Sequence, residues 1–302
     1  MRKILTSIVM AFSLITLSAC GSGEEANSGN EESASYGEQM DHQITGIEPG
    51  AGVTVTTEKV LSEYSNLAGW ELEQSSTAAM MAELGEAIDK EEPIVVTGWN
   101  PHWMFAEYPH LKYLEDPKGV YGETEEIRTL ARIGLKEEKP GAYKILDQFE
   151  WEVEDMEGIM LEAEQTGGDI EELSRQWVHD NPEKSEAWAE GVEEVDGTEV
   201  ELVTTQWDSE LTSTYAVAEV MEGKGYDVTV TPADVSVMYQ AVATGDADAT
   251  VAVWMPITTK EFYNEHKGDF EDLGANLEGA RIGMVVPGYM EIESIEDLEP
   301  SE

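Results

Sequence analysis

The sequence contains a single cysteine, Cys20, among its 302 residues. One thiol excludes both an intramolecular disulfide framework and a metal site built from several cysteines. Histidine is also scarce, and no pair has the spacing of metal ligands among the five residues His42, His102, His110, His179 and His266. GxSxG and HExxH motifs are absent as well. We therefore expect no bound metal, no cofactor and no enzymatic activity.

Two other motifs resemble known ligand loops but differ at essential positions. The glycine-rich stretch at residues 47–55 has Val55 where a dinucleotide-binding fingerprint needs its third glycine. Asp246 and Asp248 begin like a calcium loop, but Ile257 occupies the position of the bidentate glutamate. Neither a dinucleotide nor a calcium ion is predicted.

Basic residues are few, with 17 lysines and arginines against 64 acidic residues, which gives a formal net charge of −47. This charge disfavours nucleic acid and anionic membrane surfaces as partners. Salt relieves such self-repulsion, because the Debye length falls to about 3 Å at 1 M. The composition favours a salty environment; the alternative is an acidic, solvated surface without special meaning.

The N-terminus lacks an apolar run long enough to span a bilayer. Arg2 and Lys3 precede the run Ile4–Ala19, whose 16 residues fall short of the roughly 20 that a spanning helix needs. This layout is typical of an export signal. The residues LSAC (17–20) match a lipobox, so Cys20 resembles a lipid attachment site; the alternative is an ordinary signal with an incidental cysteine. We predict a signal peptide at 1–19 and a lipid-anchored protein on the extracytoplasmic face.

Apolar residues are also nearly absent from residues 21–41, which consist mainly of glycine, serine, asparagine and glutamate. Such a segment buries too little surface to offset the entropy of ordering. It predicts a flexible tether over residues 20–42. The remaining chain, about 260 residues, suffices for two lobes at roughly 150 residues per domain.

Beyond the tether, short β-branched runs alternate with helical patterns, which favours α/β architecture. The predicted strands are 94–97, 200–205, 228–231, 250–254 and 282–286, and the predicted helices are 77–88, 211–221 and 236–243. The later strands and helices form βαβ units, for which parallel right-handed crossovers are the default. Residues 123–191 have a helical period and are predicted to cover a lobe rather than to form a site.

Three tryptophans stand at the carboxyl ends of predicted strands: Trp99, Trp207 and Trp254. In open α/β sheets the ligand crevice lies beyond these ends. A quaternary ammonium has no N–H to donate, so a protein recognises it with aromatic faces, each worth roughly 0.5 to 2 kcal/mol. The pattern predicts an aromatic cage. The alternative is that these tryptophans are core residues, which is the interpretation adopted for Trp70, Trp103, Trp151, Trp177 and Trp188.

Several segments together identify a family resemblance: IEPGAGV (47–53), TGWNPHWMF (97–105), TTQWDSE (204–210) and ATGDADATVAVWMP (243–256). In the same order, they resemble the glycine betaine-binding lipoproteins of osmoprotectant ABC importers, and the likeness runs from Ile44 to the terminal SIEDL (294–298). The resemblance implies a two-lobed clamshell of the periplasmic-binding-protein type (type II) that closes by hinge motion. The expected first lobe is 43–120, with 286–302 returning to it, and the second lobe is 121–285.

By this resemblance Trp99 comes from one lobe, whereas Trp207 and Trp254 come from the other. The backbone N–H groups of Gly52 and Val53 would hold the ligand carboxylate, as expected where a glycine-rich turn opens a helix. The family pattern has a histidine at the position of Thr259, whose hydroxyl can donate a shorter, uncharged hydrogen bond.

The implied function is capture of glycine betaine or a related betaine and its delivery to an ABC permease and ATPase complex. The alternatives are the same fold binding choline, carnitine or ectoine, and a surface or structural lipoprotein without a ligand.

Overall fold

The computed structural model describes residues 35–301. The predicted signal peptide, Cys20 and most of the predicted tether lie outside the described residues. The end of that tether, however, has regular structure. Residues 36–39 form helix α1 (Tyr36–Gln39), which begins with a capping box between Ser35 and Glu38. This reciprocal hydrogen bonding satisfies two otherwise unpaired N–H groups, so the folded part begins before residue 43.

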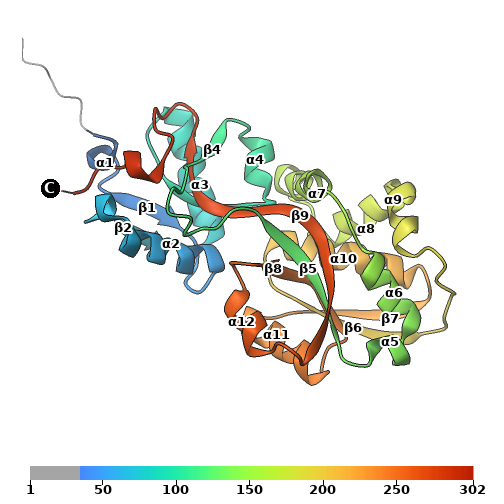
Figure 1. Cartoon of the computed structure of the whole chain (residues 1–302). Helices are drawn as coiled ribbons and strands as arrows, with labels where there is room; N and C mark the ends of the chain where they lie inside the picture. Colours follow the sequence, from blue (N-terminus) through green and yellow to red (C-terminus); the bar gives the residue numbers. More distant parts are fainter. Residues whose placement is uncertain (1–34, 302) are drawn as a thin grey trace, which may run out of the picture. The chain divides into compact units, whose positions relative to one another are not determined.

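Within the described residues the strands form one nine-stranded sheet in the order β2-β1-β3-β9-β5-β8-β6-β7, with β4 also paired to β9 (Figure 1). The strands are β1 (Gln43–Gly46), β2 (Glu71–Gln74), β3 (Val96–Asn100), β4 (Leu111–Tyr113), β5 (Glu125–Arg132), β6 (Thr198–Thr204), β7 (Tyr226–Pro232), β8 (Ala249–Met255) and β9 (Phe270–Pro287).

Helices connect and cover these strands. After α1 they are α2 (Gly52–Glu63), α3 (Thr77–Lys90), α4 (Trp103–Glu107), α5 (Leu135–Glu138), α6 (Pro140–Gln148), α7 (Val153–Thr166), α8 (Ile170–Asp180), α9 (Pro182–Trp188), α10 (Asp208–Glu222), α11 (Val235–Thr244) and α12 (Lys260–Glu265). Two short 3-10 helices are η1 (Ser65–Leu67) and η2 (Ile295–Asp297). In the part of the chain that the structure covers, none of the helices has the length and apolar content needed to cross a membrane.

Strand β9 joins two groups of strands. Its C-terminal part, from Arg281, pairs antiparallel with β3 and β4, and its earlier part, up to Ala280, pairs antiparallel with β5. We call β1 to β4 the first strand group and β5 to β8 the second strand group. The chain crosses between the groups twice, between β4 and β5 and again within β9 (Figure 1).

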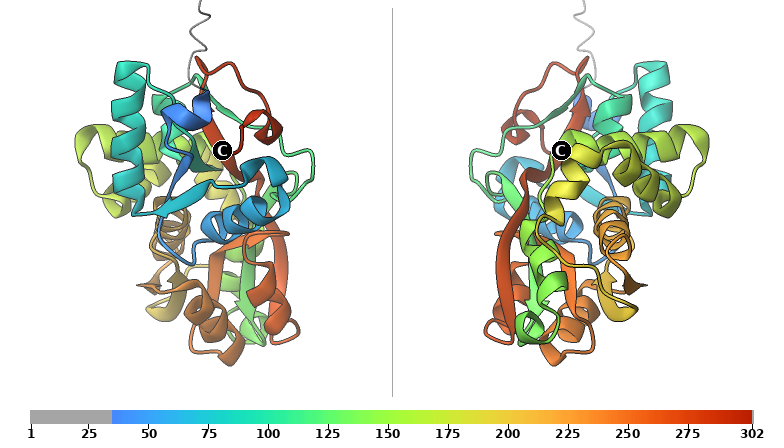
Figure 2. Two further views of the ribbon diagram at one scale, coloured as in Figure 1. Left: turned by 90° about the vertical axis from the view of Figure 1, so that its left-hand side faces the viewer. Right: turned by 90° about the vertical axis from the view of Figure 1, so that its right-hand side faces the viewer.

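The second strand group is covered on both faces, because successive side chains of a strand point to opposite sides. Leu202 of β6 belongs to the buried cluster that contains residues of α10. Its neighbour Val203 belongs to a second cluster with Met238 and Val242 of α11. Figure 2 shows helices flanking the strands in both side views. This two-sided burial explains why the β8 segment, ATVAVWM, is a nearly continuous apolar run.

The structure confirms the α/β class and each predicted strand and helix as an element of the expected type. Strands β6 and β7 are parallel, and so are β6 and β8, as the βαβ pattern predicts. The prediction for residues 123–191 was partly wrong, because the segment begins with strand β5 before α5 to α9. The predicted lobe boundaries stay a prediction.

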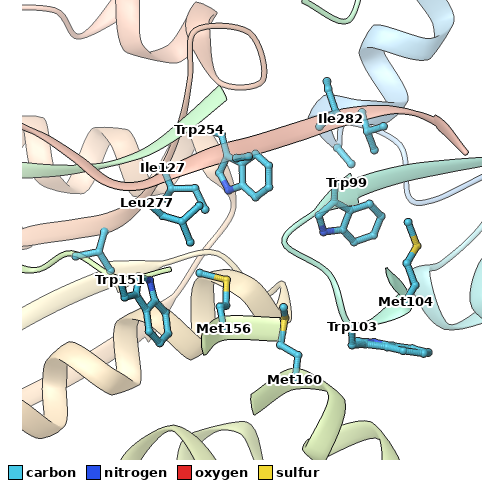
Figure 3. Close-up of a cluster of buried hydrophobic side chains, with 14 of the residues drawn as sticks. Trp99, Trp103, Met104, Ile127, Trp151, Met156, Met160, Trp254, Leu277 and Ile282 are labelled. Atoms are coloured by element: carbon cyan, nitrogen blue, oxygen red, sulfur yellow. The ribbon is translucent and has the colours of Figure 1, made fainter. Parts of the chain in front are cut away.

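Helix α7 contacts helices that follow strands of both groups. Met156 and Met160 of α7 are fully buried, and in the view of Figure 3 they stand between Trp151 and Trp103. Helix α7 contacts α4 as well as α8 and α10. Its Glu157 accepts hydrogen bonds from the Asn100 side chain and, at 3.4 Å, from the His102 N–H. Helix α7 thus fixes the loop that follows Trp99 through the hydrogen bonds of Glu157.

Candidate ligand-binding site

One pocket is lined by all six residues that the sequence proposes for a ligand: Gly52, Val53, Trp99, Trp207, Trp254 and Thr259. Trp99 lies in β3, Trp254 lies in β8, and Trp207 is the residue that caps the start of α10. Both strand groups therefore contribute an aromatic wall. Trp99 and Trp254 are buried and Trp207 is half-buried. Figure 3 shows the Trp99 and Trp254 rings, which come from strands separated in the sheet by β9 and β5.

Trp254 is held by a carboxylate that the sequence analysis did not single out. Its indole Nε1–H donates to Glu210 Oε1 over 2.5 Å, and Ser209 Oγ donates to Glu210 Oε2 over 2.6 Å. Glu210 is only 4% exposed and lines the pocket. Burial raises the pKa of this carboxyl to about 7, against the lowering effect of the Ser209 and Trp254 hydrogen bonds. Glu210 is the last residue of the segment TTQWDSE (204–210), but one carboxylate is not distinctive in so acidic a sequence.

Trp207 is oriented by a residue of the first strand group's loops. Its Nε1–H donates to Glu48 Oε1 over 2.7 Å. Glu48 lies between β1 and α2, directly before the glycine-rich turn. The hydrogen bond fixes the indole while leaving its ring faces free for other contacts.

Trp99 packs against a neutral imidazole. The His102 ring meets the Trp99 ring edge-on with centroids 4.5 Å apart. His102 Nδ1 accepts the Met104 N–H at the start of α4, and burial lowers the pKa of His102 to about 3. The imidazole is therefore uncharged at neutral pH and does not place a competing cation beside the pocket.

Helix α2 points its N-terminus at the pocket. Gly52 and Val53 are its first two residues, and Ala51, which precedes them, provides no side-chain acceptor. The first N–H groups of a helix have no partner within the helix. Together with the helix dipole they make this end favourable for an anion.

Gly52 lies against Thr258 of the second half of the chain. A Cβ added at Gly52 would stand 2.2 Å from Thr258 Cγ2, so only glycine fits this approach. Thr258 is itself held by buried Glu125 of β5, which accepts from the Ile257 and Thr258 N–H groups at 2.8 Å each. The two sides of the pocket meet here through a close backbone contact.

The role predicted for Thr259 disagrees with its bonding. Thr259 is buried, and its hydroxyl donates to the Trp254 carbonyl oxygen over 2.7 Å. A hydroxyl has one proton, so its 2.7 Å contact with the Tyr239 hydroxyl is one in which Thr259 accepts. No proton is left for a ligand, and Thr259 instead fixes the chain that follows Trp254.

Thr205 has a hydroxyl that can donate to a ligand, because its proton is not used by another residue. It lies directly after β6, lines the same pocket and is 3% exposed. Its Oγ1 has no hydrogen-bond partner among the described residues. A buried hydroxyl without a partner costs about 1 to 3 kcal/mol, and a ligand oxygen in the pocket would remove that cost. The sequence signal for it was weak, because threonine is common at strand ends.

The family model described as the substrate-binding domain of the ABC-type glycine betaine transport system matches residues 27–180 and 198–302. The chain belongs to this family. Its members are substrate-binding proteins of transport systems and not enzymes.

Relatives within the family cover different shares of the chain. The glycine betaine/carnitine transport binding protein GbuC of Listeria monocytogenes is 46% identical over 303 residues, which span 100% of this chain and 99% of that protein. Lactococcal OpuAC, solved in its closed form with glycine betaine, is 50% identical over 50% of this chain and 58% of its own, with a TM-score of 0.47. A choline-binding protein solved with choline is 26% identical over 63% of this chain and 61% of its own, with a TM-score of 0.45.

The five tryptophans predicted to be core residues do not line the pocket. Trp70, Trp103, Trp151 and Trp188 are buried, and Trp177 packs half-buried against the same cluster. Trp151 and Trp188 meet edge-on with centroids 6.1 Å apart. Among residues 35–301, no group of three or more His, Cys, Asp or Glu side chains is arranged to hold a metal ion.

Proposed function

We propose that this protein binds glycine betaine, or a close relative such as proline betaine, and delivers it to an ABC permease and its ATPase. The observation that carries the proposal is the single pocket in which three tryptophans from two strand groups surround space next to the N-terminus of α2. An aromatic enclosure suits a methylated cation, and a helix N-terminus suits a carboxylate.

The cationic end is assigned to Trp99, Trp207 and Trp254. Desolvated cation–π contacts contribute roughly 2 kcal/mol or more each. Three such rings account for selection of a trimethylammonium group over a hydrated metal ion. The neutral state of His102 supports this assignment, because a charged imidazole next to Trp99 would repel the ligand.

The carboxylate end is assigned to the N–H groups of Gly52 and Val53. Thr205 replaces Thr259 as the proposed side-chain donor, because its buried hydroxyl is unpartnered whereas that of Thr259 is committed to Trp254. A ligand with a quaternary nitrogen but no carboxylate would leave these donors unsatisfied.

The cellular setting is also part of the proposal. The sequence supports export, lipid attachment at Cys20 and residence on the extracytoplasmic face of the membrane. The charge of −47 supports work in a salty medium, since salt screens surface repulsion more than contacts inside a closed pocket. Uptake of an osmoprotectant is a function that a cell needs in such a medium.

Closure of two lobes would complete the cage. Contacts that join residues of the two strand groups, Glu48 with Trp207 and Gly52 with Thr258, support a pocket assembled by hinge motion. The permease would then distinguish loaded from empty protein by this closed arrangement.

Isothermal titration calorimetry at several salt concentrations tests the proposal, with glycine betaine, proline betaine, carnitine, choline and ectoine as ligands. We expect glycine betaine or proline betaine to bind tightest. Carnitine as the tightest ligand would reassign the substrate within the family, in keeping with the name of the Listeria relative. Absence of binding by every quaternary amine would overturn the proposal and favour a structural role.

A pair of tryptophan variants separates the cage from the core. Trp207→Leu removes the half-buried ring and should weaken betaine binding at least tenfold with an unchanged unfolding midpoint. Trp177→Leu, at an equally half-buried position outside the pocket, is the control and should leave affinity intact. Equal effects of both variants on affinity would show that the cage is misassigned.

A further inference from the structure

Glu210 is the one titratable side chain among the residues that line the pocket. We propose that the Glu210 carboxylate is the counter-charge for the ligand's cationic end, and that ligand binding releases a proton from this residue to solvent. This rests on the proposed function, because the ligand must carry a quaternary nitrogen. Neither the aromatic cage nor the helix terminus requires such a group.

Several contacts favour the ionised form of Glu210. Trp254 Nε1–H and Ser209 Oγ–H donate to its two oxygens, one donor to each. Glu210 is also the third residue of α10, within the first turn. The positive end of the helix dipole stabilises a carboxylate at this place.

Burial acts against these contacts and raises the pKa of Glu210 to near neutral pH. The side chain is almost completely enclosed, and enclosure favours the uncharged acid. The result is a pKa of about 7 for the free protein, with burial as the largest cause. A carboxyl poised in this way changes its charge readily when a charge arrives nearby.

The neighbouring groups bring no compensating positive charge. Asp208 on the same helix is acidic and raises the pKa of Glu210. Glu48, which bonds to Trp207, and Glu125, which bonds to the Ile257 N–H, are acidic as well. His102 is neutral because of its burial, and the Tyr239 hydroxyl, which carries no positive charge, bonds to Thr259. A bound quaternary ammonium would be the first cation that this carboxylate meets.

The sign of the coupling follows from linkage. A cation beside Glu210 stabilises its ionised form and lowers its pKa in the complex. Binding is therefore tight above the free-protein value of about 7 and weakens as the pH falls below it. If the pKa in the complex lies more than one unit below 5.5, affinity drops about thirtyfold between pH 8 and pH 5.5.

The same carboxylate affects the choice between ligands. Glycine betaine is a zwitterion, whose own carboxylate lies near the α2 N-terminus in the proposed pose. Choline brings an uncompensated positive charge, so the electrostatic gain from Glu210 is larger for choline. Neutralising Glu210 should therefore weaken choline more than glycine betaine and should increase the preference for betaine.

Proton release is measured by calorimetry at pH 6.5 in two buffers with different ionisation enthalpies. We expect about 0.8 proton released per glycine betaine bound. The variant Glu210→Gln keeps an acceptor for Trp254 Nε1 and a donor for Ser209, so it removes charge without removing the contacts. It should release no proton and should give a flat affinity profile from pH 8 to pH 5.5.

Asp208→Asn is the matched control, because it removes a neighbouring charge but leaves Glu210 in place. It should still release a proton on ligand binding, in a smaller amount at pH 6.5 than the unmodified protein, because loss of the Asp208 charge lowers the pKa of Glu210. Binding without proton release and with a flat pH profile in the unmodified protein would overturn the role of Glu210 while leaving the proposed function intact. Failure to bind any quaternary amine at any pH would instead remove the proposed function itself.

Discussion

The indole Nε1–H of Trp207 donates a hydrogen bond to Glu48 Oε1, 2.7 Å away. This bond connects the N-cap residue of α10 to the loop before α2. Glu48→Ala removes the acceptor and leaves the indole free to rotate. We expect glycine betaine affinity to fall about fivefold, the equivalent of one hydrogen bond of about 1 kcal/mol. Glu48→Gln retains an acceptor and should lose less than half of that free energy. Titration calorimetry of the two variants measures the difference.

Thr205 and Thr259 differ in what their hydroxyls do, and valine substitution separates them. Thr205→Val removes the unpartnered hydroxyl, so stability should be unchanged or increased while betaine affinity falls about tenfold, as for a hydrogen bond to a charged group. Thr259→Val breaks the bond to Trp254 O and leaves Tyr239 without its partner. It should lower the free energy of unfolding by about 1 to 2 kcal/mol. Urea denaturation and calorimetry on both variants check this; a reversed pattern would restore Thr259 as the donor.

Gly52→Ala tests the close approach of α2 to the loop after β8. The new Cβ would collide with Thr258 Cγ2, so affinity should fall at least tenfold while the unfolding midpoint changes little. Adding Thr258→Ser removes that methyl group but keeps the hydroxyl that donates to Glu125. Partial recovery of affinity in the double variant is the expected outcome. An unchanged affinity in Gly52→Ala alone would mean that the contact is not needed for binding.

Asp248 provides a stability test far from the pocket. It accepts from Arg132 Nε at 2.9 Å, from Lys139 Nζ at 2.7 Å and from the Glu201 N–H at 2.9 Å. Burial would raise the pKa of Asp248, but the Lys139, Glu201 and Arg132 hydrogen bonds together lower it. Asp248→Ala should therefore lower the free energy of unfolding at pH 7 by about 3 kcal/mol, as for a broken buried ion pair.

The pH dependence of that effect has a defined sign. A depressed pKa stabilises the folded state above the unfolded value of about 3.9 and loses this contribution as the pH falls through the folded value. The gap between Asp248→Ala and the unmodified protein should thus be largest at pH 7 and shrink below pH 4. Asp246→Ala, at an exposed neighbouring position, is the control and should show no such gap in denaturant titrations.

The sequence was sufficient where one periodicity dominated. Strand β8 is apolar on both faces, and Trp254 could be placed near its end for that reason. Strand β5 was missed because its residues are mostly charged or polar: Glu125 is buried yet binds N–H groups more than 130 residues away, and Arg128 pairs with Glu126 and Asp272. Such partners are set by tertiary contacts that no local pattern contains.

The candidate site shows the same division. The tryptophans and the glycine-rich turn were recognisable, because their chemistry is specific and rare. Glu210 was not, since one carboxylate among 64 acidic residues becomes distinctive only when the packing of α10 encloses it. The family resemblance pointed to Thr259 and not to Thr205, and only the hydrogen-bond partners of the two hydroxyls reverse that choice.

Strand β9 pairs Ala280 with Glu125 of β5 and the very next residue, Arg281, with Asn100 of β3. A single peptide unit is thus divided between the two strand groups, with the β4–β5 segment as the second crossing. Two rigid bodies joined by two backbone segments rotate most easily about the line through those segments. The backbone around Gly279–Arg281, together with the contacts of Glu48 with Trp207 and of Gly52 with Thr258, would then determine the energy needed to separate Trp99 from Trp254. That energy in turn governs the residence time of a ligand between the two rings.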